Sequence, residues 1–374
     1  KKLMAEFEKE LAILKGRVDG LEAKVGQLEA NQFSTTTKLK GIATMVLGGA
    51  SGLSDVNGES AGQVTFNYDL KLDLDTSFTG KDLLRTRLRA SNFQNSVFGS
   101  GNTLLEVAFQ ETNNTDVVGI DRLFYKFPIG DSFTATFGAK VRQDDMLAMW
   151  PSVYPGDSIL DMFTLAGAAG TYNLSLGAGA GVSYMKDGFN LSANFVSAEG
   201  AADDSLYGLE EGYTFTFQVG YAATNWGLAL AYAYSDYAGY IVPGAIASAP
   251  GFANNLGLSG YWQPSDAGWV PSISAGFGIG DDNQVEDSYS WMVGLQWTDV
   301  FVKGNSLGMA LGTSSDFTGG SVILDDEDSN LAYELWYKFQ VTDNISVTPA
   351  FFYIGADAGF KDTYGGLLKT TFKF

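Results

Sequence analysis

Histidine and cysteine are both absent from this chain of 374 residues. The lack of histidine excludes Ser-His-Asp and Cys-His catalytic groups and removes the commonest nitrogen ligand for metals. The lack of cysteine excludes thiolate nucleophiles, disulfides and structural zinc sites. We therefore expect neither an enzyme nor a protein with a bound cofactor or a dedicated metal site.

Long apolar runs are missing as well. The uncharged tracts 162–185, 212–235 and 237–265 are interrupted by Gly, Asn, Ser or Thr at nearly every second or third position. A membrane-spanning helix needs about 20 predominantly apolar residues, so none is expected. The first residues, KKLMAEFEKE, are charged. They lack the apolar stretch of a signal peptide, so we expect any export signal to have been removed.

Positive charge is scarce: 23 basic residues face 43 acidic ones, which gives a formal net charge of -20. Such a balance repels a phosphate backbone, so nucleic acid is not an expected partner. Inorganic cations and small solutes are the expected partners. The acidic clusters at 203–204, 281–282 and 325–328 lack the spacing of a calcium-binding loop, which favours a solvated, ion-attracting surface over a metal site.

Residues 1–32 carry a heptad pattern. Apolar residues recur with alternating spacings of three and four, and the seam comprises Leu11, Leu14, Val18, Leu21, Val25 and Leu28. This pattern predicts a parallel coiled coil that joins subunits, with an amphipathic helix packed on its own domain as the alternative. Val and Leu in these positions favour a dimer in isolated coiled coils, so a trimer would have to be imposed by the rest of the chain.

From residue 33 onwards the hydrophobic period changes to two. The apolar residues of QVTFNYDLKLDL (63–74) alternate with polar ones, and the pattern returns in DLLRTRLRAS (82–91) and YTFTFQVGY (213–221). Segments of about 9–11 residues, joined by alternately short and long connections, are typical of a transmembrane β-barrel. A soluble β-sandwich also alternates, but aromatic residues at the strand ends favour the barrel. Phe215, Leu230 and Val293 should then face lipid, and Arg87 the interior.

We count 17 candidate strands, whereas a single-chain barrel with both termini on one side needs an even number. The one candidate strand too many falls in the weakly patterned stretch 92–128. The prediction is therefore an all-β transmembrane barrel over residues 33–374 with about 16 antiparallel strands, 14 to 18 being possible, preceded by the coiled coil. Sixteen strands leave room for an aqueous channel.

Three segments resemble the cyanobacterial major outer-membrane porins, a group related to OprB-type carbohydrate-selective porins and often labelled iron uptake porins. They are LEANQFSTTTKLKG (28–41), TSFTGKDLLRTRLRASNF (76–93) and IDRLFYKFPIGDSFTATFGA (120–139). The resemblance implies an outer-membrane homotrimer with a periplasmic stalk. It also implies a preceding surface-layer-homology domain that binds peptidoglycan or wall polysaccharide, which is not part of the printed sequence. Phe372 and Phe374 resemble the family's C-terminal assembly signal.

Two sets of charged residues are candidates for lining the channel. Arg85, Arg87 and Arg89 share the polar face of one strand, opposite Asp69, Lys71 and Asp73 of its hairpin neighbour. They predict a transverse field across the lumen, although the two rows could equally serve to neutralise each other. The further candidates from this half of the chain are Arg122, Lys126, Lys140 and Arg142.

The longest connection, 143–170, mixes acidic with large apolar residues. Its acids are Asp144, Asp145, Asp157 and Asp161, and its apolar groups include Met146, Met149, Trp150 and Tyr154. Apolar side chains are unfavourable on a free surface loop, so we expect the segment to fold inward and constrict the pore. Packing at a subunit interface is the alternative.

The predicted function is a porin for passive diffusion of small hydrophilic solutes, mainly inorganic ions with a preference for cations. One alternative is a carbohydrate-selective channel, for which Phe124 and Trp336 on otherwise polar faces are the hints. The other is a chiefly structural tether between outer membrane and peptidoglycan.

Overall fold

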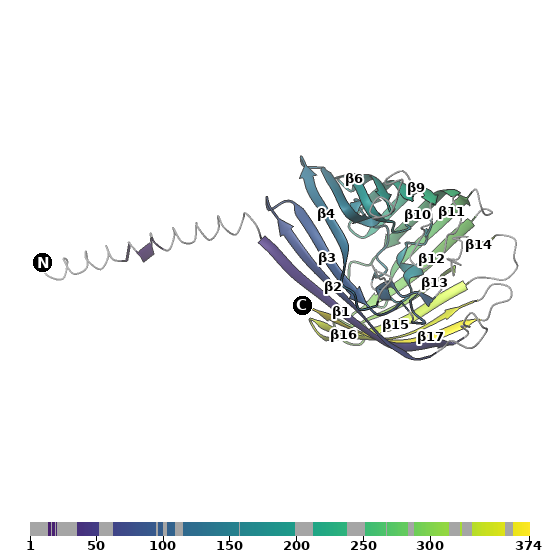
Figure 1. Cartoon of the computed structure of the whole chain (residues 1–374). Coiled ribbons are helices and arrows are strands. Elements are labelled where there is room, and N and C mark those ends of the chain that lie inside the picture. Colours follow the sequence, from purple (N-terminus) through teal and green to yellow (C-terminus); the bar gives the residue numbers. More distant parts are fainter. Residues whose placement is uncertain are drawn as a thin grey trace, which may run out of the picture.

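The computed structural model describes residues 14–15, 17–18, 20, 36–51, 63–94, 96–99, 103–108, 115–156, 158–198, 212–237, 251–266, 268–282, 288–313, 322–323, 331–355 and 362–374. Within these residues the chain forms one closed antiparallel sheet (Figure 1). The strands are β1 (Thr36–Ser51), β2 (Thr65–Ser77), β3 (Leu83–Ser91), β4 (Gly119–Ile129), β5 (Phe133–Arg142), β6 (Leu176–Lys186), β7 (Phe189–Ser197), β8 (Tyr213–Ala222), β9 (Trp226–Tyr237), β10 (Gly251–Trp262), β11 (Ser272–Asp282), β12 (Ser288–Thr298), β13 (Ser306–Thr313), β14 (Val322–Ile323), β15 (Leu331–Thr342), β16 (Ile345–Ile354) and β17 (Thr363–Lys373).

Sixteen of these strands form the barrel wall. Each pairs with its neighbour in sequence, β13 pairs directly with β15, and β1 pairs with β17 to close the sheet. β14 is a two-residue segment that pairs only with the end of β12. The predicted number of strands is confirmed. The surplus candidate near 103–111 contains an isolated bridge at Leu105 and the 3-10 helix η2 (Glu106–Ala108) instead of a strand.

The connections differ between the two ends of the barrel. At the end where β1 begins and β17 finishes, turns and short connections of two to nine residues join consecutive strands, and the remaining consecutive strands are joined across the opposite end (Figure 1). Gly130 and Gly188 adopt positive φ of 63° and 86° in two of these turns, a conformation that a side chain would disfavour. We call these the turn end and the loop end.

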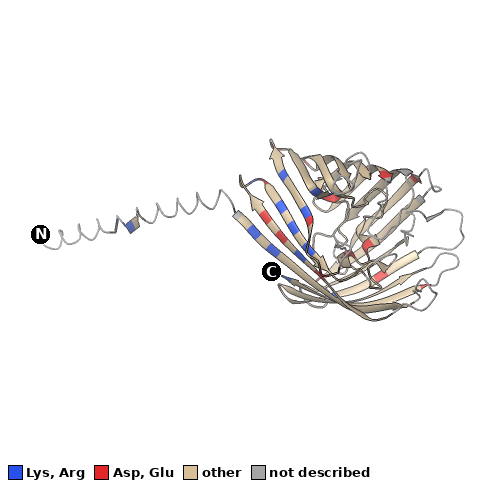
Figure 2. Ribbon diagram, viewed as in Figure 1, with Lys and Arg blue, Asp and Glu red and all other residues tan. Residues whose placement is uncertain are grey.

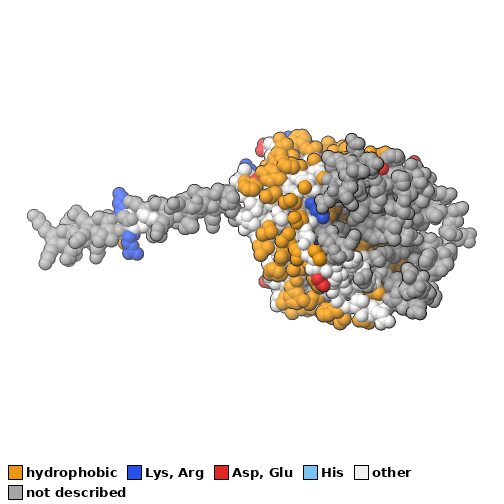
Figure 3. Space-filling model, viewed as in Figure 1, with side chains coloured by type: hydrophobic (Ala, Val, Ile, Leu, Met, Phe, Trp, Pro, Cys, Tyr) orange, Lys and Arg blue, Asp and Glu red, His pale blue; other side chains and the backbone are white. Residues whose placement is uncertain are grey.

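Strand residues alternate between the outer surface and the interior. Phe215, Leu230 and Val293 are exposed on the outside by 43%, 44% and 38%, with no second sheet against them in the described part of the chain. On the face shown in Figure 3, hydrophobic side chains gather over the part of the barrel nearer the turn end. Arg87 points inward and its side chain is only 21% exposed. The barrel, rather than the sandwich, is therefore confirmed.

The hydrophobic core lies inside the barrel. Two stretches fill much of the interior: described residues 92–94, 96–99 and 103–108 between β3 and β4, and described residues 143–156 and 158–175 between β5 and β6, which we call segment 143–175. They pair where the amide of Asp161 donates to the carbonyl of Leu104 at 3.0 Å. The apolar cluster there combines Phe93, Phe98, Leu104, Leu105, Leu160 and Phe163 with Phe352 and Ile354 of the wall. Glycines let the chain approach closely, because a Cβ on Gly276 of β11 would overlap the carbonyl of Ala166.

Little of the N-terminal heptad region is described. Leu14 and Val18 are helical and exposed, whereas Leu11, Leu21, Val25 and Leu28 lie outside the described residues. The coiled coil therefore stays a prediction. Over the part of the chain that the structure describes, no helix is long and apolar enough to cross a membrane.

Candidate functional site

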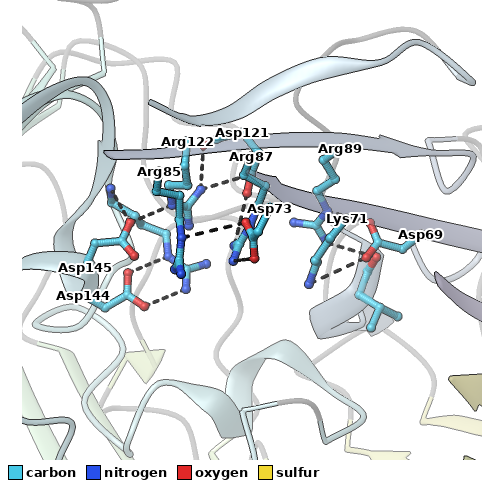
Figure 4. Close-up of polar contacts among 12 residues, drawn as sticks. Asp69, Lys71, Asp73, Arg85, Arg87, Arg89, Asp121, Arg122, Asp144 and Asp145 are labelled. Carbon is cyan, nitrogen blue, oxygen red and sulfur yellow. Dashed lines mark hydrogen bonds and ion pairs between the residues drawn. The ribbon is translucent and has the colours of Figure 1, made fainter. Parts of the chain in front are cut away.

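The strand pair β2–β3 carries a ladder of ion pairs on its inner face (Figure 4). Its register places Asp73 opposite Arg87 and Asp75 opposite Arg85. Both arginines bind bidentately: Nε and Nη2 of Arg87 donate to the two Asp73 oxygens at 2.7 and 3.0 Å. Arg85 binds Asp75 in the same way at 2.8 and 3.0 Å. The predicted strand faces thus bring these residues together.

One ion pair between β2 and β3 is diagonal, because Lys71 and not an acid lies directly opposite Arg89. Arg89 turns away from this like charge and its Nε donates to Asp69 at 2.6 Å. Lys71 lies 3.6 Å from Asp69 and 3.5 Å from Glu106 of η2. The Arg89–Asp69 pair is almost fully buried, whereas Lys71 is partly exposed.

β4 and the 3-10 helix η3 (Gln143–Met146) extend the network. Arg122 donates to Asp145 at 2.7 Å and lies 3.0 Å from Asp121. Asp121 also reaches Arg87 at 3.4 Å, and Arg142 binds Asp144 bidentately at 2.6 Å. A register shift where β3 pairs with β4 lets the consecutive residues Asp121 and Arg122 both be buried, which strict alternation forbids.

The charges of this network balance. Among the described residues, seven basic side chains pair with seven acidic ones: Lys40, Lys71, Arg85, Arg87, Arg89, Arg122 and Arg142 with Asp69, Asp73, Asp75, Glu106, Asp121, Asp144 and Asp145. Figure 2 shows blue and red concentrated on the first strands, while most of the wall is tan. We call this set the charged wall.

Water reaches the interior along the charged wall. The side chains of Arg85, Arg87 and Arg142 are 23%, 21% and 27% exposed although they point into the barrel. On the opposite wall, inward side chains such as Gln218 of β8 and Met292 of β12 are buried. Partly exposed ion pairs therefore border the lumen beside β2–β5.

The inward segment 143–175 covers the opposite wall. The amides of Val153 and Tyr154 both donate to Oγ of Ser274 on β11 at 2.9 Å. The hydroxyl of Tyr172 donates to Gln218 at 2.8 Å. The small polar residues of β7–β12 thus serve as hydrogen-bonding partners for this segment, which accounts for their neutral character.

A cavity of about 190 Å³ remains between the charged wall and the two inward segments. Its charged and aromatic lining is Arg89, Glu106, Arg142, Asp144, Trp150 and Asp161. Asp161 belongs to the 3-10 helix η4 (Asp161–Thr164), and its Oδ2 has no hydrogen-bonding partner among the described residues. Burial, with the nearby Glu106 carboxylate, raises the pKa of Asp161 to about 7.

The remaining described residues that the sequence suggested for the channel lining and the assembly signal are not part of the cavity lining. Lys126 donates to the carbonyl of Asp145, and its Nζ lies 5.8 Å from the centre of the Phe124 ring. Lys140 is half-buried on β5, and Asp157 lies outside the described residues. At the end of β17, Phe374 is exposed and its backbone pairs with Gly41.

Phe124 and Trp336, the suggested contacts for sugars, are both buried. Phe124 packs with Val141, Met146 and Val196, and Trp336 lies under Tyr154. The interpretation of these two rings as exposed lumen residues is wrong, because the inward segment packs over them. Sequence reasoning also missed Asp75, Glu106 and Asp121. Of these only Asp75 could have been found, since it continues the alternation of β2.

In the described residues no group of three or more acidic side chains could hold a metal ion. What the arrangement offers is a cavity beside partly exposed charged side chains, bordered by fixed hydrogen-bond donors and acceptors. A passage with such a border sorts solutes by size and polarity without a chemical step.

Comparison with known sequences agrees with this architecture. The family model described as "Carbohydrate-selective porin, OprB family" matches residues 1–374. An uncharacterized protein of Nostoc sp. is 31% identical over 423 residues, and the match covers all of this chain and 71% of the relative. An uncharacterized protein of Synechocystis sp. is 29% identical over 419 residues, with 100% and 76% covered. The resemblance to cyanobacterial porins is confirmed.

Solved porins share the fold. The structure of Pseudomonas putida OprB at high pH has a TM-score of 0.61 at 13% identity, and the match covers 93% of this chain and 96% of that chain. The trimer form of Vibrio cholerae OmpT has a TM-score of 0.54 at 9% identity, with 91% and 100% covered. These likenesses concern the fold alone. Together with the family model, they identify an outer-membrane channel protein and not an enzyme: the chain belongs to the OprB family of carbohydrate-selective porins.

Proposed function

We propose that the chain forms a water-filled channel for passive diffusion of small, uncharged hydrophilic solutes of the carbohydrate class, with small ions passing by the same route. The passage runs along the charged wall, and segment 143–175 is its constriction.

The pairing of charges on the wetted wall carries this proposal. Seven cations matched to seven anions leave little net charge there, so the wall discriminates weakly between cations and anions. The same groups present many fixed donors and acceptors, which suit a solute rich in hydroxyl groups. The indole of Trp150 adds an apolar surface beside the 190 Å³ cavity, which is smaller than the ~300–1,000 Å³ of drug-sized pockets.

A second candidate is a channel mainly for inorganic ions that prefers cations. Asp161 and Glu106 favour it, since both carboxyls border the cavity and the whole chain has a net charge of -20. An acidic approach to a pore raises the local cation concentration.

Two measurements on the purified protein separate these functions. Liposome swelling reports sugar entry, and reversal potentials in a KCl gradient across a planar bilayer report ion preference. The proposal expects hexoses to enter faster than anions of similar size, with a reversal potential near zero. A strongly cation-selective current without sugar entry would favour the second candidate. No conductance at all would overturn both channel functions and would favour a structural tether between outer membrane and peptidoglycan.

We also propose that the barrels form a homotrimer with the turn end in the periplasm and the heptad helix as a periplasmic stalk. The heptads of residues 1–32 support it. So does the trimer form of the similar OmpT porin. In such an assembly a domain ahead of the stalk would bind peptidoglycan. Chemical cross-linking in detergent tests the subunit number, and a ladder that stops at the monomer would contradict it.

A further inference from the structure

A carboxylate on the far wall holds the inward segment. Glu334 of β15 points into the barrel and is 1% exposed. Its Oε1 accepts a hydrogen bond from the Tyr154 hydroxyl at 2.7 Å, and its Oε2 accepts one from the amide of Leu160, also at 2.7 Å. One side chain of the wall therefore binds the segment at two points six residues apart.

Two neighbours on the wall add to this attachment. Nε1 of Trp336 donates to the Tyr154 hydroxyl at 2.9 Å, and Nζ of Lys369 on β17 donates to the carbonyl of Ser158. Burial and the Glu334 carboxylate raise the pKa of Tyr154 well above its usual value. The phenol therefore stays protonated and remains a donor.

The attached residues directly adjoin the cavity. Gly156, within the bound stretch, and Asp161, directly after it, both line the cavity. Any movement of residues 154–160 away from β15 would shift these two lining residues and change the width of the passage.

The chemistry of a carboxylate suits an attachment of this kind. Docked, its buried charge is compensated by two donors and by the nearby Lys369. Undocked, water in the lumen would solvate it, so the released state carries no unpaired buried charge. An apolar residue at this position could pack against the segment, but it could not form the directional hydrogen bonds that fix the segment's position.

We propose that Glu334 is the positioning residue of the constriction: through Tyr154 and Leu160 it fixes segment 143–175 at the distance from the charged wall that sets the size of the passage. This proposal rests on the proposed function of the segment as a constriction.

Labelling of an engineered cysteine tests the attachment without relying on transport. The chain has no cysteine, and Ile159 is 2% exposed between the two bound residues. In an Ile159→Cys protein, a water-soluble maleimide should react slowly. Adding Glu334→Ala should speed the reaction about tenfold or more, as expected when a buried hydrogen bond to a charged group is lost. Tyr154→Phe removes only the hydroxyl and should give a smaller increase.

Single-channel recording tests the effect on the passage. Glu334→Ala, without the cysteine, should increase the conductance and the noise of the open state. Glu334→Gln keeps the shape but loses one acceptor, and should lie between wild type and Glu334→Ala. Tyr333→Phe is the matched control, since Tyr333 is on the same strand but faces outward. It should leave labelling and conductance unchanged.

The outcomes separate this proposal from the one it rests on. Unchanged labelling of Ile159→Cys in the Glu334→Ala and Tyr154→Phe backgrounds would overturn the role of Glu334, whatever the channel conducts. Faster labelling with unchanged conductance would also overturn it, because the segment would then move without altering the passage. A wild-type protein that does not conduct would contradict the proposed function, while labelling would still decide whether Glu334 holds the segment. If Glu334→Ala fails to fold, labelling and conductance of the Tyr154→Phe and Glu334→Gln variants test the role of Glu334 instead.

Discussion

At the scale of single residues, burial separates the charged groups into two kinds. Arg89 and Asp69 are almost fully buried, with Arg89 at the margin of the cavity, whereas Arg85 and Arg87 remain partly exposed. A pair of the first kind mainly holds the interior together, because removing one partner leaves a buried charge without compensation. Pairs of the second kind border the passage and act on what moves through it.

We therefore predict unequal costs of substitution within one ladder. Arg89→Ala should lower the free energy of unfolding by about 3 kcal/mol, since it leaves the buried Asp69 with only the longer contact to Lys71 at 3.6 Å. Arg85→Ala should cost about 1 kcal/mol or less, because the exposed Lys40 still pairs with Asp75 at 2.9 Å. Urea unfolding in detergent, followed by tyrosine and tryptophan fluorescence, measures both. Equal destabilisation would contradict the distinction.

Asp161 should make the channel sensitive to pH. Its pKa is raised to about 7, so the carboxyl is mostly neutral below this pH and ionised above it. Ionisation adds a negative charge at the cavity, and cation preference should therefore rise between about pH 6 and about pH 8. Reversal potentials in a KCl gradient measure the change. Asp161→Asn should abolish it, and a change that persists in this variant would have another origin.

At the scale of elements, the sequence predicts regular strands well and irregular ones poorly. The alternation in 63–74 and 82–91 correctly placed Asp73 and Arg87 on one face, because a paired strand has a fixed period of two. It could not place Asp121, since the register shift at β4 depends on its partner strands. Nor could it recognise that Trp336 is covered, because that cover is a segment nearly two hundred residues away in the chain.

The inward segments were the least predictable elements. The stretch 92–128 is weakly patterned because residues such as Phe93, Phe98 and Leu105 pack in a core inside the barrel with no regular period, so the strand predicted near 103–111 was wrong. The composition of 143–170 did indicate an unusual loop, but not which wall residues it would contact. No sequence pattern distinguishes Glu334 from the other acidic residues of the chain, 43 in all. Only the fold shows that it binds Tyr154 and Leu160.

Unpairing the exposed part of the ladder should alter ion selectivity. Arg85→Ser with Arg87→Ser leaves the carboxylate of Asp73 uncompensated beside the passage and Asp75 paired with Lys40 alone. The double variant should shift the reversal potential toward cation selectivity and reduce anion flux. Lys186→Ser at the turn end is a control that removes a basic charge outside the charged wall. Equal shifts in both proteins would show that the ladder has no special influence.

At the scale of the whole molecule, the barrel has two unlike halves. β2–β5 carry paired, partly exposed charges, whereas β7–β13 carry mainly neutral inward residues. β15 and β17 add Glu334 and Lys369, which hold segment 143–175. The asymmetry confines the wetted lumen to one side of a wide barrel. A sixteen-stranded wall can therefore enclose a passage much narrower than its own diameter.

Cysteine accessibility tests this confined passage most directly, because the native chain contributes no thiol of its own. Arg87→Cys lies on the wetted wall and Gln218→Cys under the inward segment. A bulky, water-soluble thiol reagent added during planar-bilayer recording should reduce the current through the Arg87→Cys channel and leave the Gln218→Cys channel unaffected. Block at Gln218→Cys with an unaffected Arg87→Cys channel would contradict the account, because solutes would then pass along the opposite wall.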